Sequence, residues 1–390
     1  MIDLKLASST WDDKEIDAMM RVISSSEFTM GKKVKEFENE FAELIGTKYA
    51  LMVNSGSSAN LLLVAGLKYM ANSKLEDGDE FLVPTISWST TYYPIQQMGF
   101  KLRFVDVNES TLNIDVDKLE DAITEKTRGI FAVNLLGNPC DFQKIESLAN
   151  KHDLLLLEDN CESLGAEFLS KKTGSFGIGG THSFFYSHHI CTMEGGMVTT
   201  NSKELLETMV SLRAHGWLRG LDPQNSVHPL SDSNWDNLFK FVLPGYNLRP
   251  LELQAAVGLE QIKKLPQFIE ARRKNALTFQ EFFRDVPNIS IQKEYGSSSW
   301  FGFAIILNDK LLGKRKIVLD KLHELRVETR PIVAGNFLKN PVIKHLPHSL
   351  YGSFETADHI DQNGFFIGNH HYDISNKLEA IAELLLQFND

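Results

Sequence analysis

Cysteine is scarce in this chain of 390 residues, and no apolar run approaches the length needed to span a membrane. The three cysteines, Cys140, Cys161 and Cys191, are widely spaced with no CxxC pair, which argues against a disulfide framework and a zinc site. Basic residues are outnumbered 40 to 51, and the net charge of −11 argues against nucleic acid as a partner. The acidic N-terminus lacks the apolar segment of a signal peptide. These absences predict a cytoplasmic protein with no membrane partner.

Short apolar runs alternate with amphipathic stretches over the first two-thirds of the chain, which predicts an α/β fold with a mostly parallel sheet. After about Arg249 the pattern becomes mainly helical with one extended stretch, so we predict a large domain over 1–249 and a smaller α+β domain over 250–390. The predicted strands are 49–53, 80–84, 102–107, 129–134 and 154–158, with an extended stretch at 299–307. The predicted helices are 13–24, 33–45, 57–70, 115–124, 141–151, 203–214, 251–285, 316–325 and 376–388.

The first chemical motif is SGSSAN at 55–60, directly after the strand predicted at 49–53 and at the start of a helix. Small residues at such a turn let backbone N–H groups approach an oxyanion, and the helix dipole favours a phosphate there. A plain strand–turn–helix with serine as the N-cap explains the same residues equally well.

The second motif is LEDNCES, in which Asp159 ends an apolar strand. A carboxylate at the C-terminal end of a parallel strand faces the crevice where ligands bind in open α/β sheets, and it could pair with the ring nitrogen of pyridoxal phosphate (PLP). Glu162 could reach the ring hydroxyl, and Trp88 in PTISW could stack on the ring. Alternatively, Asp159 caps a turn, Glu162 is a solvated loop acid and Trp88 belongs to the core.

The stretch SFFYSHHICTMEGG at 183–196 contains no lysine, and none occurs between Thr173 and Ser202. Ordinary PLP enzymes hold the cofactor on a lysine amine and also use that amine to move protons. His188 and His189 lie in the middle of this stretch. Imidazole carries a proton near neutral pH but cannot replace the covalent bond to the cofactor. If the chain binds PLP, it therefore binds it without covalent attachment.

In their order along the chain, SGSSAN, PTISW, LEDNCESLGA, SFFYSHHICTMEGGMV and PGYNLRP resemble the sugar-nucleotide aminotransferase and dehydratase family of fold type I PLP enzymes. The resemblance runs over nearly the whole chain and implies the aminotransferase-like fold. It also implies that Gly56, Ser57 and Ser183 hold the cofactor phosphate, that Trp88 stacks on the ring, and that Asp159 and Glu162 meet its nitrogen and hydroxyl.

The resemblance further implies a homodimer with shared active sites, in which Asn247 reaches the phosphate of the neighbouring subunit's cofactor. The position of the family's cofactor lysine, five residues after the serine of the SF motif, is occupied by His188. This replacement is typical of the family's dehydratase branch. Some members of that branch carry an iron–sulfur cluster, which needs four cysteines. The three cysteines of this chain, none of them between His215 and Asn247, argue against a cluster.

The activity implied by this branch is removal of the C3 hydroxyl of a GDP-4-keto-6-deoxyhexose, giving a 4-keto-3,6-dideoxy sugar for lipopolysaccharide O-antigen. The reaction would use L-glutamate as amino donor and PLP or pyridoxamine phosphate, with His188 as the catalytic base. We also predict that His215 and Arg219 line the sugar-nucleotide site and that Arg330 meets the glutamate carboxylate. Two alternatives stay open: a 3-dehydratase or aminotransferase acting on a CDP- or UDP-linked 4-keto sugar, and a PLP-fold binding protein without catalysis.

Overall fold

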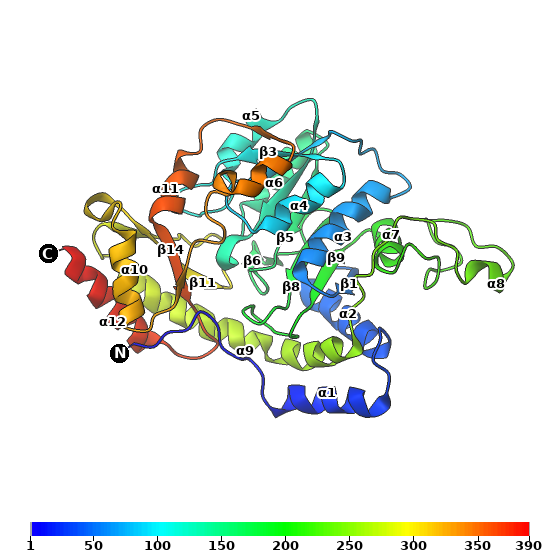
Figure 1. Cartoon of the computed structure of the whole chain (residues 1–390), viewed down its shortest axis with the longest axis horizontal. Helices are drawn as coiled ribbons and strands as arrows, with labels where there is room; N and C mark the ends of the chain where they lie inside the picture. The colour runs from blue at the N-terminus through cyan, green and yellow to red at the C-terminus, as the bar shows by residue number, and fades with distance from the viewer. Residues whose placement is uncertain (1, 390) are drawn as a thin grey trace.

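A computed structural model describes residues 2–389, and its centre is a sheet of eight strands covered by helices (Figure 1). Six neighbouring strands run parallel, and β9 pairs antiparallel with both β8 and β1. The predicted class, an α/β fold with a mostly parallel sheet, is confirmed. In spatial order the strands are β1 (Tyr49–Val53), β9 (Gly196–Thr200), β8 (Gly179–Ser183), β5 (Leu155–Asp159), β4 (Thr127–Val133), β2 (Glu80–Pro84), β3 (Lys101–Val105) and β13 (His348–Leu350).

The helices around this sheet begin and end where local signals place them. Asp12 and Glu15 form a capping box at the start of α1, and α2 ends at Gly46, whose φ of +83° is the left-handed C-cap conformation. The 3.6-residue spacing of Phe37, Phe41 and Ile45 puts all three side chains in the core. The bounds are α1 (Asp13–Ser25), α2 (Lys32–Ile45), α3 (Gly56–Tyr69), α4 (Ser89–Gln97), α5 (Leu119–Ala122), α6 (Phe142–Lys151), α7 (Lys203–Arg213) and α8 (Asn234–Asn237).

A smaller sheet of four strands lies in the C-terminal part, together with four helices. The long helix α9 runs from the large sheet to this smaller one (Figure 1). The elements are α9 (Glu252–Phe283), β10 (Ile289–Ile291), β11 (Gly302–Leu307), α10 (Arg315–Glu324), β12 (Thr329–Arg330), α11 (Glu355–Asn363), β14 (Gly364–Gly368) and α12 (Ser375–Leu386), and a separate ribbon pairs β6 (Glu167–Phe168) with β7 (Lys171–Lys172).

The division into 1–249 and 250–390 stays a proposal, because two segments cross it. Leu4 forms a bridge with Val327 and packs in the core of the smaller sheet, while β13 joins the large sheet beside β3. The helix predicted at 115–124 is a 3₁₀ turn followed by the short α5. Among residues 2–389, none of the helices combines the length and apolar character that a membrane crossing needs.

Candidate active site

The start of α3 and the end of β8 lie close together at the C-terminal ends of the parallel strands, where they form a narrow cradle. Ser55 caps α3 by accepting a 3.1 Å hydrogen bond from the Ser58 N–H. A Cβ on Gly56 would lie 2.5 Å from the Ser183 Cβ, so only glycine lets the helix start this close to β8. Gly56, Ser57 and Ser183 therefore lie together, with the unpaired N–H groups of a helix N-terminus beside two hydroxyl groups.

The first turn of α4 lies next to this cradle. The hydroxyl groups of Ser57 and Thr90 are 2.8 Å apart, which joins α3 to α4. Trp88 is the residue before α4 and is 58% exposed, an unusual environment for a large aromatic side chain. The alternative that Trp88 belongs to the core is therefore wrong, and its ring is free to stack on a ligand.

Asp159 is buried at the C-terminal end of β5, as predicted. Its Oδ2 accepts hydrogen bonds from the Thr91 hydroxyl at 2.7 Å and the Asn60 amide at 2.9 Å. Its Oδ1 accepts a weaker bond of 3.2 Å from the backbone N–H of Cys161. One carboxylate oxygen is thus fixed by two side chains, and the carboxylate as a whole is held in one orientation.

Sequence reasoning did not assign roles to Asn60 and Thr91. Asn60 belongs to the SGSSAN motif and lies one turn beyond Gly56 on α3, so helical spacing could have drawn attention to it. Thr91 gave no comparable signal, because its contact with Asp159 depends on how α4 packs beside β5.

Glu162 is half-buried near the same C-terminal ends of the parallel strands. Its Oε2 accepts a 3.0 Å hydrogen bond from the Leu136 N–H. Burial, with a smaller contribution from the charge of Asp159, raises the pKa of Glu162 to about 7. A carboxyl group with this pKa exchanges a proton readily near neutral pH, which suits a partner of a ring hydroxyl.

His188 lies in the loop between β8 and β9. Its ring is half-buried and packs edge-to-face against Phe301, with ring centroids 5.3 Å apart and planes at 66°. The buried Nδ1 has no hydrogen-bond partner within residues 2–389. Burial first, and the positive charge of Arg272 second, lower the pKa of His188 to about 4. The imidazole is therefore neutral at physiological pH and able to accept a proton.

A short chain of contacts joins His188 to Glu162. The Leu136 N–H is bound to Glu162, and the Leu136 carbonyl accepts a 2.9 Å hydrogen bond from the Phe301 N–H. Phe301 in turn packs against His188. The neighbouring His189 is fully buried. Its Nε2 donates a 3.1 Å hydrogen bond to the Ser299 carbonyl, which indicates a structural role for this histidine.

The stretch that contains Asn247, the residue predicted to serve the second subunit, adjoins the SGSSAN motif: the Leu248 carbonyl accepts a 3.1 Å hydrogen bond from the Asn54 N–H, just before the motif. His215 has a φ of +64° and donates its N–H to the Tyr246 carbonyl at 2.6 Å. Asn247 is exposed on the adjoining stretch and forms a bridge with Ala214. Arg219 and Arg330 are also exposed. In the part of the chain that the structure describes, no hydrogen bond, ion pair or ring contact joins these four residues to Asp159 or His188.

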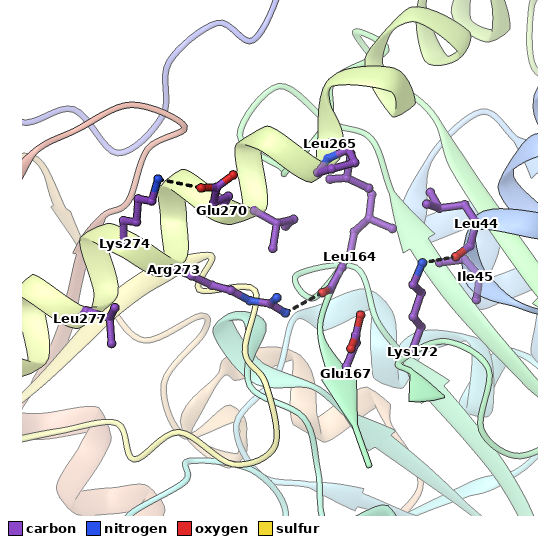
Figure 2. Close-up of a pocket in the computed structure, with 13 residues that line it drawn as sticks. Leu44, Ile45, Leu164, Glu167, Lys172, Leu265, Glu270, Arg273, Lys274 and Leu277 are labelled. Atoms are coloured by element: carbon purple, nitrogen blue, oxygen red, sulfur yellow. Dashed lines mark hydrogen bonds and ion pairs between the residues drawn. The ribbon is translucent and has the colours of Figure 1, made fainter. Parts of the chain in front are cut away.

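A cavity of about 390 Å³ lies away from this cluster, between the end of α2, the loop before β6 and α9 (Figure 2). Its cationic side chains are already paired. Lys172 donates to the Leu44 carbonyl at 2.7 Å, Arg273 donates to the Gly165 carbonyl at 3.1 Å, and Lys274 lies 2.7 Å from Glu270. None of the residues predicted to bind the cofactor lines this cavity.

The family model for the DegT/DnrJ/EryC1/StrS aminotransferases matches residues 9–385. The chain belongs to this family. It is 52% identical over 392 residues to the GDP-4-keto-6-deoxy-D-mannose 3-dehydratase of Yersinia pseudotuberculosis, covering 99% of this chain and 98% of the relative. The resemblance drawn from the motifs is thereby confirmed.

Two solved structures of a GDP-4-keto-6-deoxymannose-3-dehydratase are closely similar to the structure of this chain. One is an H188N mutant with bound GDP-perosamine, and the other contains a trapped PLP-glutamate geminal diamine. Each is 48% identical, superposes with a TM-score of 0.96, and covers 98% of this chain and 100% of the solved chain. The roles of the individual residues named above stay predictions.

Proposed function

We propose that this chain is a PLP- and L-glutamate-dependent 3-dehydratase acting on GDP-4-keto-6-deoxy-D-mannose. The observation that carries the proposal is the position of His188, which lies in the loop directly after the Ser183 cradle in a stretch that contains no lysine. The 52% identity to a relative of that name supports it. The solved relative with bound GDP-perosamine supports the guanine nucleotide.

The residues present fit PLP. A Cβ at Gly56 would fill the cradle where the phosphate is expected, and Ser57 and Ser183 provide hydroxyl donors there. Asp159 would bind the protonated ring nitrogen, while Trp88 would stack on the ring and Glu162 would bind its hydroxyl. When bound, PLP supplies an electron sink for the carbon beside the amine that it holds.

His188 would be the residue that both accepts and returns protons during the reaction. As a neutral imidazole it accepts the proton from the α-carbon of glutamate, and as imidazolium it returns a proton to the departing C3 hydroxyl of the sugar. Glutamate is oxidised by two electrons to 2-oxoglutarate and ammonia, and the sugar is reduced at C3. The hydroxyl leaves as water and one water is consumed in releasing ammonia, so the atoms balance.

The absence of a lysine at the cofactor determines which sugar product is released. An aminotransferase needs an amine at the cofactor to release an amino sugar, and His188 cannot form that bond. The sugar therefore leaves as a 4-keto-3,6-dideoxy product. Asn247, which is exposed and follows the end of α8 by ten positions in the sequence, would complete the cofactor site of a second subunit in a homodimer. Cytoplasmic localisation stays a prediction from the sequence.

Product analysis tests this proposal. The purified protein is incubated with PLP, L-glutamate and GDP-4-keto-6-deoxy-D-mannose, and the nucleotide sugars are separated and weighed by mass spectrometry. The expected product is lighter than the substrate by one oxygen atom, with equal amounts of 2-oxoglutarate and ammonia. An amino sugar would identify an aminotransferase, and turnover of only the CDP- or UDP-linked ketone would overturn the choice of nucleotide.

A further inference from the structure

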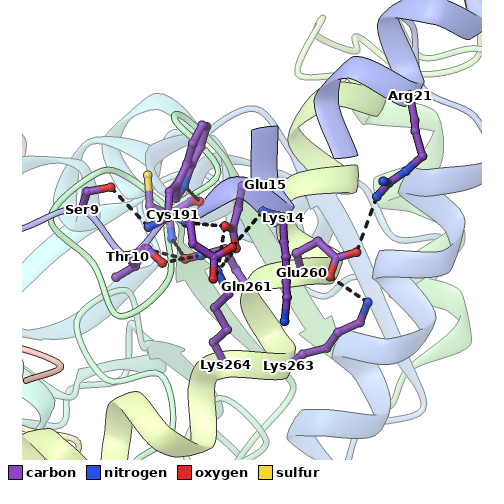
Figure 3. Close-up of polar contacts among 12 residues, drawn as sticks. Ser9, Thr10, Lys14, Glu15, Arg21, Cys191, Glu260, Gln261, Lys263 and Lys264 are labelled. Carbon is purple, nitrogen blue, oxygen red and sulfur yellow. Dashed lines mark hydrogen bonds and ion pairs between the residues drawn. The ribbon is translucent and has the colours of Figure 1, made fainter. Parts of the chain in front are cut away.

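One face of α9 carries three buried polar side chains, Gln254, Gln261 and Arg272, at intervals of seven and eleven positions. These intervals correspond to about two and three helical turns, so the three side chains share a face. Gln254 donates to the Glu194 carbonyl at 2.6 Å. Figure 3 shows Gln261, which accepts from the Cys191 N–H at 3.0 Å. Both contacts fix the far end of the loop that carries His188.

Arg272 makes the third contact, with the segment that touches His188. Its Nη1 donates to the carbonyl groups of Trp300, Phe301 and Asn369 at 3.3, 3.1 and 3.0 Å. Trp300 is buried with a φ of +47°, a left-handed conformation that is strained for a bulky residue. The Asn369 amide binds the same Trp300 carbonyl at 2.9 Å. This segment is thus held in a strained conformation by several charge-assisted and neutral hydrogen bonds.

The segment contacts both histidines of the loop. The Phe301 ring packs edge-to-face on His188, and the Ser299 carbonyl accepts from His189. We infer that Arg272 is a positioning residue for the base: by binding the Phe301 carbonyl it fixes the Phe301 ring against the His188 imidazole. This inference rests on the proposed function, since it presumes that His188 acts as a base.

The electrostatic environment of His188 agrees with the geometry. The groups that act on its charge are Arg272 from α9 and the Phe185 carbonyl. The charge of His188 in turn acts on the neighbouring His189, and the segment at 299–301 contributes no charged side chain. Burial and Arg272 lower the pKa of His188, so the base stays neutral until the pH falls to about 4. Without the Arg272 charge this pKa would rise. The imidazole would then begin to take up a proton at a higher pH than in the wild type.

Arg273 offers a matched control on the next position of α9. It also binds backbone carbonyl groups, donating to Ser298 at 3.0 Å. Its second contact, with Gly165 at 3.1 Å, lies in the region drawn in Figure 2. It is not among the groups that shift the pKa of His188. Replacing either arginine by methionine removes a charge and a set of carbonyl contacts, but only Arg272→Met alters the surroundings of His188.

The first readout is independent of activity. Histidine-selectively labelled holoenzyme is titrated by NMR, and the His188 signals are identified by their loss in His188→Asn. In Arg272→Met the His188 midpoint should move to higher pH than in the wild type, whereas in Arg273→Met it should stay. Equal midpoints in all three proteins, or equal shifts in the two methionine variants, would overturn the inference.

The second readout is the rate at which glutamate converts bound PLP to pyridoxamine phosphate. Phe301→Leu should slow this conversion by about 10-fold to 100-fold, since small misplacement of a reacting group has effects of that size, with PLP affinity unchanged. Arg272→Lys keeps the charge and should retain the wild-type midpoint even if Arg272→Met fails to fold. A wild-type rate in Phe301→Leu would overturn the positioning role. Absence of conversion in the wild type would instead contradict the proposed function, and the NMR comparison would still decide the inference.

Discussion

The hydroxyl of Thr91 donates a 2.7 Å hydrogen bond to Oδ2 of Asp159. The Ser87 hydroxyl lies 2.8 Å from that of Thr91 and can donate to it, which makes a short chain of hydrogen bonds ending on the carboxylate. Asn60 binds the same carboxylate oxygen from α3. The residue expected to meet the ring nitrogen of PLP is therefore oriented by two helices that begin at the cofactor cradle.

Asp159→Asn should reduce the glutamate-driven conversion of PLP by roughly 100-fold or more, the usual effect of losing a preorganised electrostatic partner. The amide is nearly isosteric, so the thermal midpoint should change little. Both are measured at saturating PLP, by absorbance and by calorimetry. Activity close to that of the wild type would show that Asp159 is not the partner of the ring nitrogen.

Thr91→Val tests the orientation of that carboxylate. The variant removes one hydrogen bond to a charged group, a contribution of about 1.5–3 kcal/mol, so the same conversion should slow by roughly 10-fold or more. The effect should vanish in an Asp159→Asn background, because the carboxylate that Thr91 orients is then absent. Equal losses in both backgrounds would mean that Thr91 acts elsewhere.

Gly56→Ala should weaken PLP binding. Its Cβ would lie 2.5 Å from the Ser183 Cβ, and forcing the two elements apart should also destabilise the fold by about 1–3 kcal/mol. Gly66→Ala is the control on the same helix, since its Cβ would lie 2.7 Å from Leu205. Both variants should lose stability in thermal unfolding, but only Gly56→Ala should raise the dissociation constant for PLP.

The wild-type protein should hold its cofactor without a covalent bond. After treatment with borohydride, its intact mass should equal that of the polypeptide, because no lysine lies between Thr173 and Ser202. His188→Lys supplies an amine at that position and should gain a cofactor-sized adduct and an absorption band to the red of pyridoxamine phosphate. It should also lose most of the dehydratase turnover. An adduct in the wild type would contradict non-covalent binding.

The parts of the fold that could be predicted from the sequence are those with clear hydrophobic patterns. The bounds of β1 and β2 match the prediction, and those of β5 differ by one residue. In contrast, β8 reads GGTHS and is fully buried, with a polar composition that predicts no strand. Its Gly180 lies where a Cβ would be 2.5 Å from the Gly174 carbonyl, so close backbone packing selects glycine there.

The candidate site shows the same limit. Asp159 and His188 could be found because each follows a predicted strand or replaces a residue type that the chemistry needs. Thr91 and Arg272 could not, because Thr91 acts on Asp159, 68 positions away, and Arg272 binds carbonyl groups 28, 29 and 97 positions away. From the sequence alone, polar residues on a helix cannot be distinguished from ordinary surface residues. Their binding partners become known only from the packing of the folded chain.

The most direct test of the account compares His188→Asn with the wild type in both halves of the reaction. Asparagine keeps a polar side chain of similar reach but cannot accept and return a proton. The variant is mixed with PLP and glutamate, then, preloaded with pyridoxamine phosphate, with GDP-4-keto-6-deoxy-D-mannose, and absorbance and product mass are recorded. We expect cofactor to bind while both conversions slow by roughly 100-fold or more. Release of the deoxygenated sugar, 2-oxoglutarate and ammonia at the wild-type rate would contradict the central claim that His188 is the base.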